Sequence, residues 1–175
     1  MPSLFSIDSG LYRQRHSLRP PLPASRETIL IPDSYRTSTA GEEFLLYESP
    51  SHNIIIFCTP SSLQHLCRAN LISMDGTFDA APELFMQIFT LHAFEHEKLL
   101  PLAYCLLSSK DRNSYAEVFS VLKRKAQLLG IALNPATILS DFESGLIAAV
   151  RDEFPNALHQ GCYFHFTQIS KKPNF

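Results

Sequence analysis

The order of apolar and polar positions predicts a regular series of strands and helices from residue 71 onward. Three apolar runs, at 71–77, 84–94 and 99–108, have the length and composition of successive strands. The polar turn at 95–98 separates the second run from the third. We therefore expect these two strands to form an antiparallel hairpin.

Helical spacing follows the third strand. Between residues 114 and 130 the apolar positions recur at helical intervals, with Ser114 and Glu117 as a predicted capping box and Gly130 as the stop. The remaining pattern predicts a fourth strand at 136–141, a helix at about 142–153 that Pro155 closes, a fifth strand at 157–163 and the start of a helix at 164–172.

The chain before residue 71 divides into two parts. Residues 1–41 mix Arg, Ser and Pro with little periodicity, which predicts an extended or poorly ordered arm whose basic residues either contact phosphate or are simply solvated. Residues 42–70 predict two lead-in strands, at 43–49 and 53–59, and a short helix. We assign residues 71–175 to the core.

This element order predicts an α/β fold. Three antiparallel strands followed by two parallel strands form a mixed five-stranded sheet, which right-handed crossovers flank with helices on both faces. If the fourth strand lies beside the first, Asp75 and Asp141 emerge at the carboxyl ends of adjacent parallel strands. Open α/β sheets usually bind ligands at that place.

Two carboxylates at such a place repel each other unless a proton or a cation lies between them. Mg²⁺ accepts carboxylate and water oxygens, and paired ions can activate a water and stabilise the leaving oxygen of a phosphodiester. Each acid also has a simpler explanation, because Asp75 and Gly76 are a common turn pair and Asp141 could be a helix N-cap. The pair, rather than either acid alone, indicates a metal site.

Composition limits the alternatives. The net charge of −2 does not indicate a dedicated DNA-binding module. The cysteines lie far apart in mostly apolar stretches, as in reduced intracellular proteins. Because no apolar run reaches the ~20 residues of a membrane helix, we expect a soluble protein with no membrane partner.

Three segments together resemble a known family. They are MDGTFDAAPELFMQIFTLHA, LPLAYCLLSSKDRNSYAEVFSVLK and ILSDFESGLIAAVRDEFPNALHQGCYFHFTQ, and over about residues 43–175 the chain resembles the MULE (Mutator-like element) transposase domain. The resemblance implies a ribonuclease H-like fold and a catalytic set of Asp, Asp and Glu that binds two divalent ions, Mg²⁺ or Mn²⁺. It places the first acid on Asp75 and the second on Asp141.

The resemblance also implies partners and a location. It implies that the protein binds DNA, both the transposon ends and the target, and that it is intracellular and nuclear. A homo-oligomer is an open alternative. The family's glutamate comes well downstream of a Cys-x-x-His motif, so we expect it beyond these 175 residues. Glu143 is the nearest substitute, although the first turn of a helix favours a negative side chain with or without metal.

Cys162 and His165 match the family's Cys-x-x-His motif. Structural zinc normally takes four ligands, so zinc binding needs further residues from elsewhere, such as Cys58, Cys67 or His159. The alternative is a buried thiol and a histidine that fix the corner between strand and helix.

Two functions remain from different classes. The first is the catalytic core, or a fragment of it, of a DNA transposase that performs metal-dependent phosphodiester cleavage and strand transfer. The second is a catalytically inactive, transposase-derived module that binds DNA or protein. A ribonuclease H-like nuclease acting on RNA hybrids shares the metal chemistry but matches the local motifs less well.

Overall fold

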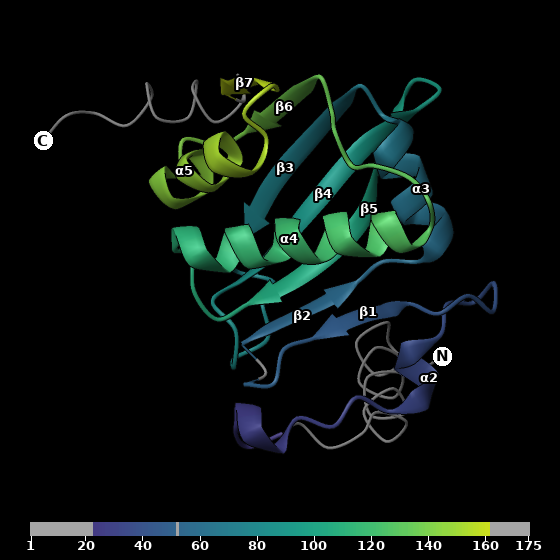
Figure 1. The fold of residues 1–175 in the computed structure, drawn as a ribbon. Coiled ribbons are helices and arrows are strands. Elements are labelled where there is room, and N and C mark those ends of the chain that lie inside the picture. Colours follow the sequence, from purple (N-terminus) through teal and green to yellow (C-terminus); the bar gives the residue numbers. More distant parts are fainter. Residues whose placement is uncertain (1–22, 52, 162–175) are drawn as a thin grey trace, which may run out of the picture.

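The computed structural model describes residues 23–51 and 53–161, which form one mixed sheet with helices packed against it (Figure 1). Its strands are β1 (Leu45–Glu48), β2 (Ile54–Phe57), β3 (Leu71–Thr77), β4 (Gln87–Glu95), β5 (Lys98–Leu107), β6 (Thr137–Ser140) and β7 (Leu158–Gly161). Its helices are a 3-10 turn (Arg26–Thr28), α2 (Asp33–Arg36), α3 (Pro60–Arg68), α4 (Arg112–Leu128) and α5 (Ser144–Glu153). The strand order is β1-β2-β5-β4-β3-β6-β7.

The five strands after residue 71 pair as the sequence predicts. β3, β4 and β5 are antiparallel neighbours, β6 runs parallel to β3, and β7 runs parallel to β6. The predicted count of five is wrong, because β1 and β2 belong to the same sheet and bring it to seven strands. The physical reason lies in β2, whose residues Ile54, Ile55 and Ile56 are all buried. Pairing with β5 buries this apolar strand and closes an edge that would otherwise expose unpaired backbone groups.

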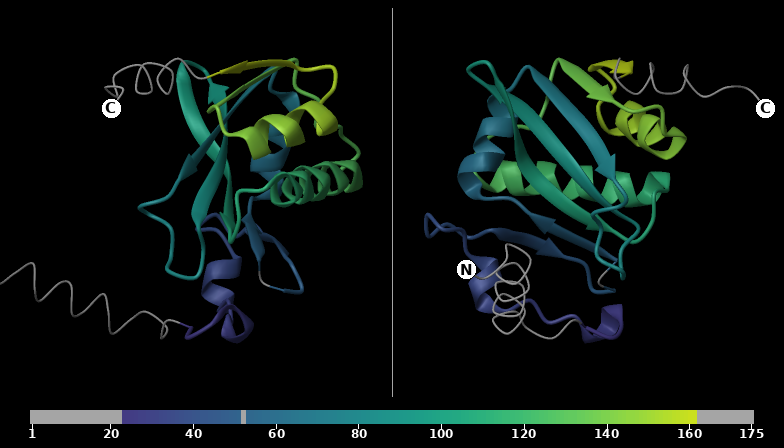
Figure 2. Two further views of the ribbon diagram at one scale, coloured as in Figure 1. Left: turned by 90° about the vertical axis from the view of Figure 1, so that its left-hand side faces the viewer. Right: turned by 180° about the vertical axis from the view of Figure 1, so that it is seen from behind.

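Helices α3, α4 and α5 lie on one face of the sheet (Figure 2). α3 contacts β4, β5 and α4, and α5 packs along α4. The prediction that the crossover helices flank both faces is therefore wrong, because α4 and α5 share one face. α3 belongs to this layer because its buried Leu63 and Leu66 join the same apolar core as α4. The helix predicted at 164–172 lies outside the described residues.

At the start of α4 the predicted capping residues are wrong, and at its end the predicted stop at Gly130 is confirmed. Asp111 is the N-cap, and its side chain accepts a hydrogen bond from the Ser114 backbone N–H at 2.8 Å. The expected capping box is therefore wrong, because Glu117 instead accepts a hydrogen bond from the Tyr47 hydroxyl at 2.9 Å. Gly130 has a φ of 73° just after the helix, which is the left-handed conformation that stops helices and that glycine adopts at little cost.

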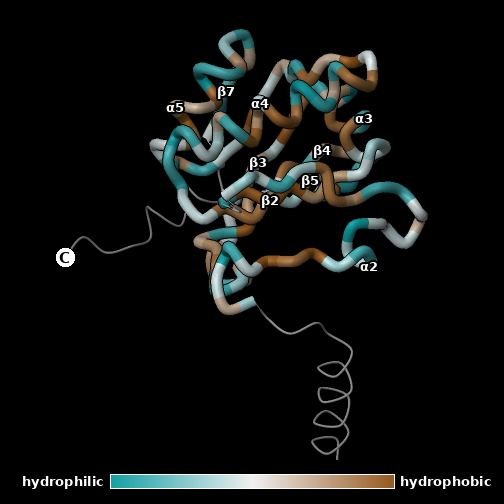
Figure 3. The backbone as a smooth tube through the Cα atoms, turned by 60° about the horizontal axis from the view of Figure 1, so that its bottom comes forward, coloured by the Kyte–Doolittle hydropathy of each residue, from teal (hydrophilic) through white to brown (hydrophobic). Residues whose placement is uncertain are grey.

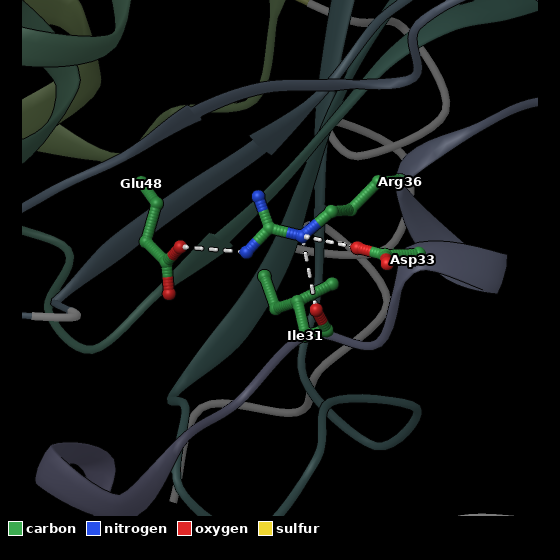
Figure 4. A network of polar contacts seen from close by, with 4 residues as sticks. All are labelled: Ile31, Asp33, Arg36 and Glu48. Atoms are coloured by element: carbon green, nitrogen blue, oxygen red, sulfur yellow. Dashed lines mark hydrogen bonds and ion pairs between the residues drawn. The ribbon is translucent and has the colours of Figure 1, made fainter.

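The segment before β1 is tied to the sheet by polar and apolar contacts. Arg36 of α2 donates a hydrogen bond to the Ile31 carbonyl at 3.0 Å and lies 3.8 Å from Asp33 and 4.0 Å from Glu48 of β1 (Figure 4). An apolar stretch leads into α2 (Figure 3), and its Ile29 helps line a cavity of about 410 Å³ beside β2 and β5. This segment therefore covers part of the face that α3, α4 and α5 leave open.

The apolar layer between the sheet and α4 should dominate stability. Phe119 is fully buried, with its ring 5.2 Å from that of Phe154 and 6.3 Å from that of Phe89. We expect Phe119→Ala to lower the free energy of unfolding by about 3–5 kcal/mol in urea titrations. Leu128→Ala, on the exposed side of the same helix, should change it by less than about 0.5 kcal/mol. Equal losses in the two variants would contradict this packing.

Candidate functional site

Asp75 and Asp141 lie on neighbouring parallel strands. The last paired residues of β3 and β6 are Ser73 and Leu139, so the same register brings Asp75 level with Asp141, one residue beyond the end of β6. Ile72 and Met74 of β3, and Ile138 and Ser140 of β6, are buried. Because side chains alternate along a strand, the two aspartates share the opposite face, at the carboxyl edge of the sheet.

The surroundings of Asp75 fix its backbone. Asp75 is half-buried and pairs with Thr90 of β4, whose hydroxyl donates a hydrogen bond to the Asp75 carbonyl at 3.1 Å. The Nε2 atom of His92 lies 2.8 Å from the Thr90 hydroxyl oxygen. The hydroxyl proton is already given to Asp75, so His92 is the donor in this contact. Burial lowers the pKa of His92, and the negative charge of Asp75 opposes that shift.

Asp141 holds the turn that leads into α5. Its Oδ1 atom accepts a hydrogen bond from the Glu143 backbone N–H at 3.3 Å. The N-cap of α5 is Glu143, whose side chain makes no capping bond. The explanation of Asp141 as a helix N-cap is therefore wrong, and its carboxylate lies between the end of β6 and the start of the helix.

Glu143 points its carboxylate toward the helix layer. Its Oε1 atom accepts a hydrogen bond from the Tyr115 hydroxyl of α4 at 2.9 Å. Burial raises the pKa of Glu143, the Tyr115 hydrogen bond lowers it, Asp141 raises it and Lys110 lowers it. Across residues 23–51 and 53–161, no group of three or more His, Cys, Asp or Glu side chains could hold a metal ion. Asp75 and Asp141 are the two acids that the β3–β6 pairing brings level, and carboxylate oxygens are a type of ligand that suits a hard divalent ion.

Gly76 is not in a turn. It lies inside β3, paired with Phe89 of β4, and a Cβ atom at this position would be 2.5 Å from the Oε1 atom of Gln87. Gln87 is fully buried, and its amide nitrogen donates a hydrogen bond to the Tyr115 hydroxyl at 2.7 Å. The turn explanation of the Asp-Gly pair is therefore wrong. Sequence reasoning missed Gln87 and Tyr115, and the one available signal was a glutamine inside an otherwise apolar strand.

A second polar contact lies beneath Asp141. The buried Ser140 hydroxyl donates a hydrogen bond to the Asp141 carbonyl at 2.9 Å and lies 2.8 Å from Nε2 of His159 on β7. One hydroxyl has one proton, so His159 donates to Ser140. Burial lowers the pKa of His159, which favours the neutral ring.

Of the residues considered for zinc, the structure describes Cys58, Cys67 and His159. Cys162 and His165 lie outside the described residues. Cys58 follows β2 and Cys67 lies on α3, whereas His159 is on β7, and four strands separate β2 from β7. Burial raises the pKa of Cys58 to about 12, so without a bound metal its thiol stays protonated at neutral pH.

Comparison with known protein families identifies the family of this chain. Residues 71–169 match the family model of the MULE transposase domain, which is more than half of the chain. No curated protein matches the chain. Within the part that the structure describes, no helix is both long and apolar enough to cross a membrane.

The close contact at Gly76 gives a direct test. We expect Gly76→Ala to lower the free energy of unfolding by about 1–3 kcal/mol, because the new methyl group must displace the Gln87 amide. The cost should shrink when the same change is made in a Gln87→Ala background, where the space is free. Chemical denaturation of the four proteins measures both values. An unchanged cost in the Gln87→Ala background would contradict the contact.

His159 predicts a pH dependence of stability. Its folded pKa lies below the ordinary value of 6.5, so the unfolded chain takes up a proton first as the pH falls. Stability should therefore fall as the pH drops below about 6.5. Urea titrations at about pH 7.5 and about pH 5.5 should show a smaller fall for His159→Gln, whose amide can still donate to Ser140. An identical fall in both proteins would contradict this role.

Proposed function

Since this chain belongs to the MULE transposase family, we propose that it is a metal-dependent, DNA-cleaving core of a transposase, with Asp75 and Asp141 as its metal ligands. The observation that carries the proposal is the parallel pairing of β3 with β6, which brings the two acids level at one sheet edge. We further propose that β3 to β7 with α4 and α5 form a ribonuclease H-like core. Its partner would be DNA and its location the nucleus.

The chemistry follows from the donor set. When bound, Mg²⁺ or Mn²⁺ lowers the pKa of a bound water and stabilises the leaving oxygen of a phosphodiester. The chain supplies two aspartates, one held through its backbone and the other through its side chain. The Thr90 hydroxyl holds the carbonyl of Asp75, and the Glu143 N–H holds Oδ1 of Asp141. Asp75 and Asp141, fixed in this way, would hold the metal in one place, and the bound metal would supply the charge that orients a phosphodiester.

One observation favours a second function. The described residues contain no third acid grouped with Asp75 and Asp141, and the Glu143 carboxylate is held by Tyr115. A pair of acids is fewer than the three that the family uses. The alternative is a catalytically inactive, transposase-derived module that binds DNA or protein.

Metal titration tests the site itself. We expect Asp75→Asn and Asp141→Asn each to weaken Mn²⁺ binding by at least about tenfold, because each removes one charged ligand. Asp79→Asn is the matched control, since Asp79 is exposed in the loop after β3 and should leave affinity unchanged. Calorimetry or Mn²⁺ spin resonance measures the affinity. Equal affinity in all four proteins would exclude this pair as the metal site.

Cleavage assays then separate the two functions. The catalytic core should cut labelled duplex DNA in Mn²⁺, with activity lost in Asp75→Asn and Asp141→Asn but kept in Asp79→Asn. Mn²⁺ binding that depends on both acids, without any cleavage, would support the inactive module.

A further inference from the structure

Two polar side chains lie inside the apolar layer between β4 and α4. Gln87 is 0% exposed and Tyr115 is 1% exposed, and the Gln87 amide nitrogen donates to the Tyr115 hydroxyl at 2.7 Å. The hydroxyl in turn donates to Oε1 of Glu143 at 2.9 Å. Burying such groups costs free energy unless they are hydrogen-bonded, so this chain of bonds constrains its members strongly.

The chemistry of the groups fixes the direction of these bonds. An amide nitrogen only donates and a carboxylate only accepts, so the Tyr115 oxygen accepts from Gln87 and its proton goes to Glu143. Burial, followed by the bond to Glu143, raises the pKa of Tyr115, while the bond from Gln87 opposes the shift. The phenol therefore remains a donor at neutral pH.

One end of this chain of bonds adjoins Gly76, the residue after Asp75, and the other end is Glu143, whose backbone N–H holds Asp141. Oε1 of Gln87 fills the space where a side chain at Gly76 would begin, one residue after Asp75. At the other end, the Glu143 backbone N–H donates to Oδ1 of Asp141 at 3.3 Å. Oε1 of Gln87 is buried without a hydrogen bond from any described residue. An apolar side chain of similar size would avoid that cost, so core packing alone does not account for the glutamine.

Building on the proposed function, we propose that Gln87 and Tyr115 position the metal site by holding the turn at 141–143 against α4 and, through α4, against β4, the strand that pairs with β3. Tyr115 donates its hydroxyl proton to Glu143, and it acts on Asp141 through that residue. It is therefore a positioning residue, and Glu143 serves as its acceptor rather than as the third metal ligand.

Tyr115→Phe is the sharpest variant, because it removes one hydroxyl and keeps the ring that packs 4.9 Å from Phe89. Its matched control is Tyr47→Phe. Tyr47 also donates to a glutamate of α4, Glu117, at 2.9 Å, but it does so from β1. We expect Tyr115→Phe to weaken Mn²⁺ binding by about 5- to 10-fold and Tyr47→Phe to leave it unchanged.

A second measurement needs no metal. Hydrogen exchange of the Glu143 amide, followed by NMR in the metal-free protein, should be faster in Tyr115→Phe than in wild type and unchanged in Tyr47→Phe. Glu143→Gln separates positioning from ligation, because its amide oxygen still accepts from Tyr115 while its charge is gone. We expect Mn²⁺ affinity within about twofold of wild type in this variant.

The outcomes distinguish this inference from the proposed function. Unchanged Glu143 exchange in Tyr115→Phe would overturn the inference alone, as would a large loss of Mn²⁺ affinity in Glu143→Gln. A wild-type protein that binds no Mn²⁺ through Asp75 and Asp141 would overturn the proposed function. If Tyr115→Phe does not fold, Gln87→Met breaks the same chain of bonds from its other end, and the same two readouts apply.

Discussion

The parallel pairing of β3 with β6 is the constraint on which the rest of the structure depends. β3 is already fixed on its other side by the antiparallel pairing with β4, so one edge remains for a returning strand. α4 carries the chain back to that edge and buries its apolar side against the sheet on the way. Two acids that are far apart in the sequence thereby reach one place. Without this pairing the two aspartates would lie too far apart to repel each other, and they would not form a pair that a cation could bind.

Two buried polar residues lie near this pairing. Four polar residues are buried in the described ranges, and two of them have ordinary local roles: Ser49 accepts from the Ile54 N–H, and Thr59 caps α3. The other two, Gln87 and Ser140, adjoin Gly76 and Asp141. Polar groups inside an apolar layer destabilise a fold unless their hydrogen bonds are satisfied. Their position beside the two acids is therefore the strongest sign that this sheet edge is built for more than stability.

The family match and the sheet have different extents. The match covers residues 71–169, whereas β1 and β2 precede residue 71 and still pair into the same sheet through β5. The strands that carry the acids thus lie within the family's range, and the two additional strands protect the edge farthest from them. This arrangement keeps the β1–β2 pairing away from the strands that carry Asp75 and Asp141, because β2 contacts neither β3 nor β6.

The sequence alone determined the local features. The apolar runs predicted the bounds of β3 and the approximate positions of the other strands, and Gly130 marked the end of α4. The order of the elements indicated that Asp75 and Asp141 would lie on neighbouring strands. Only the tertiary structure decided that Gly76 leaves room for the Gln87 side chain of β4. It also decided that Asp111 caps α4 and that Glu143 faces Tyr115. Periodicity and turn chemistry act over a few residues, so they can be read along the chain. The contacts that decided the rest join side chains from different elements, and their geometry is fixed only when the sheet and helices pack.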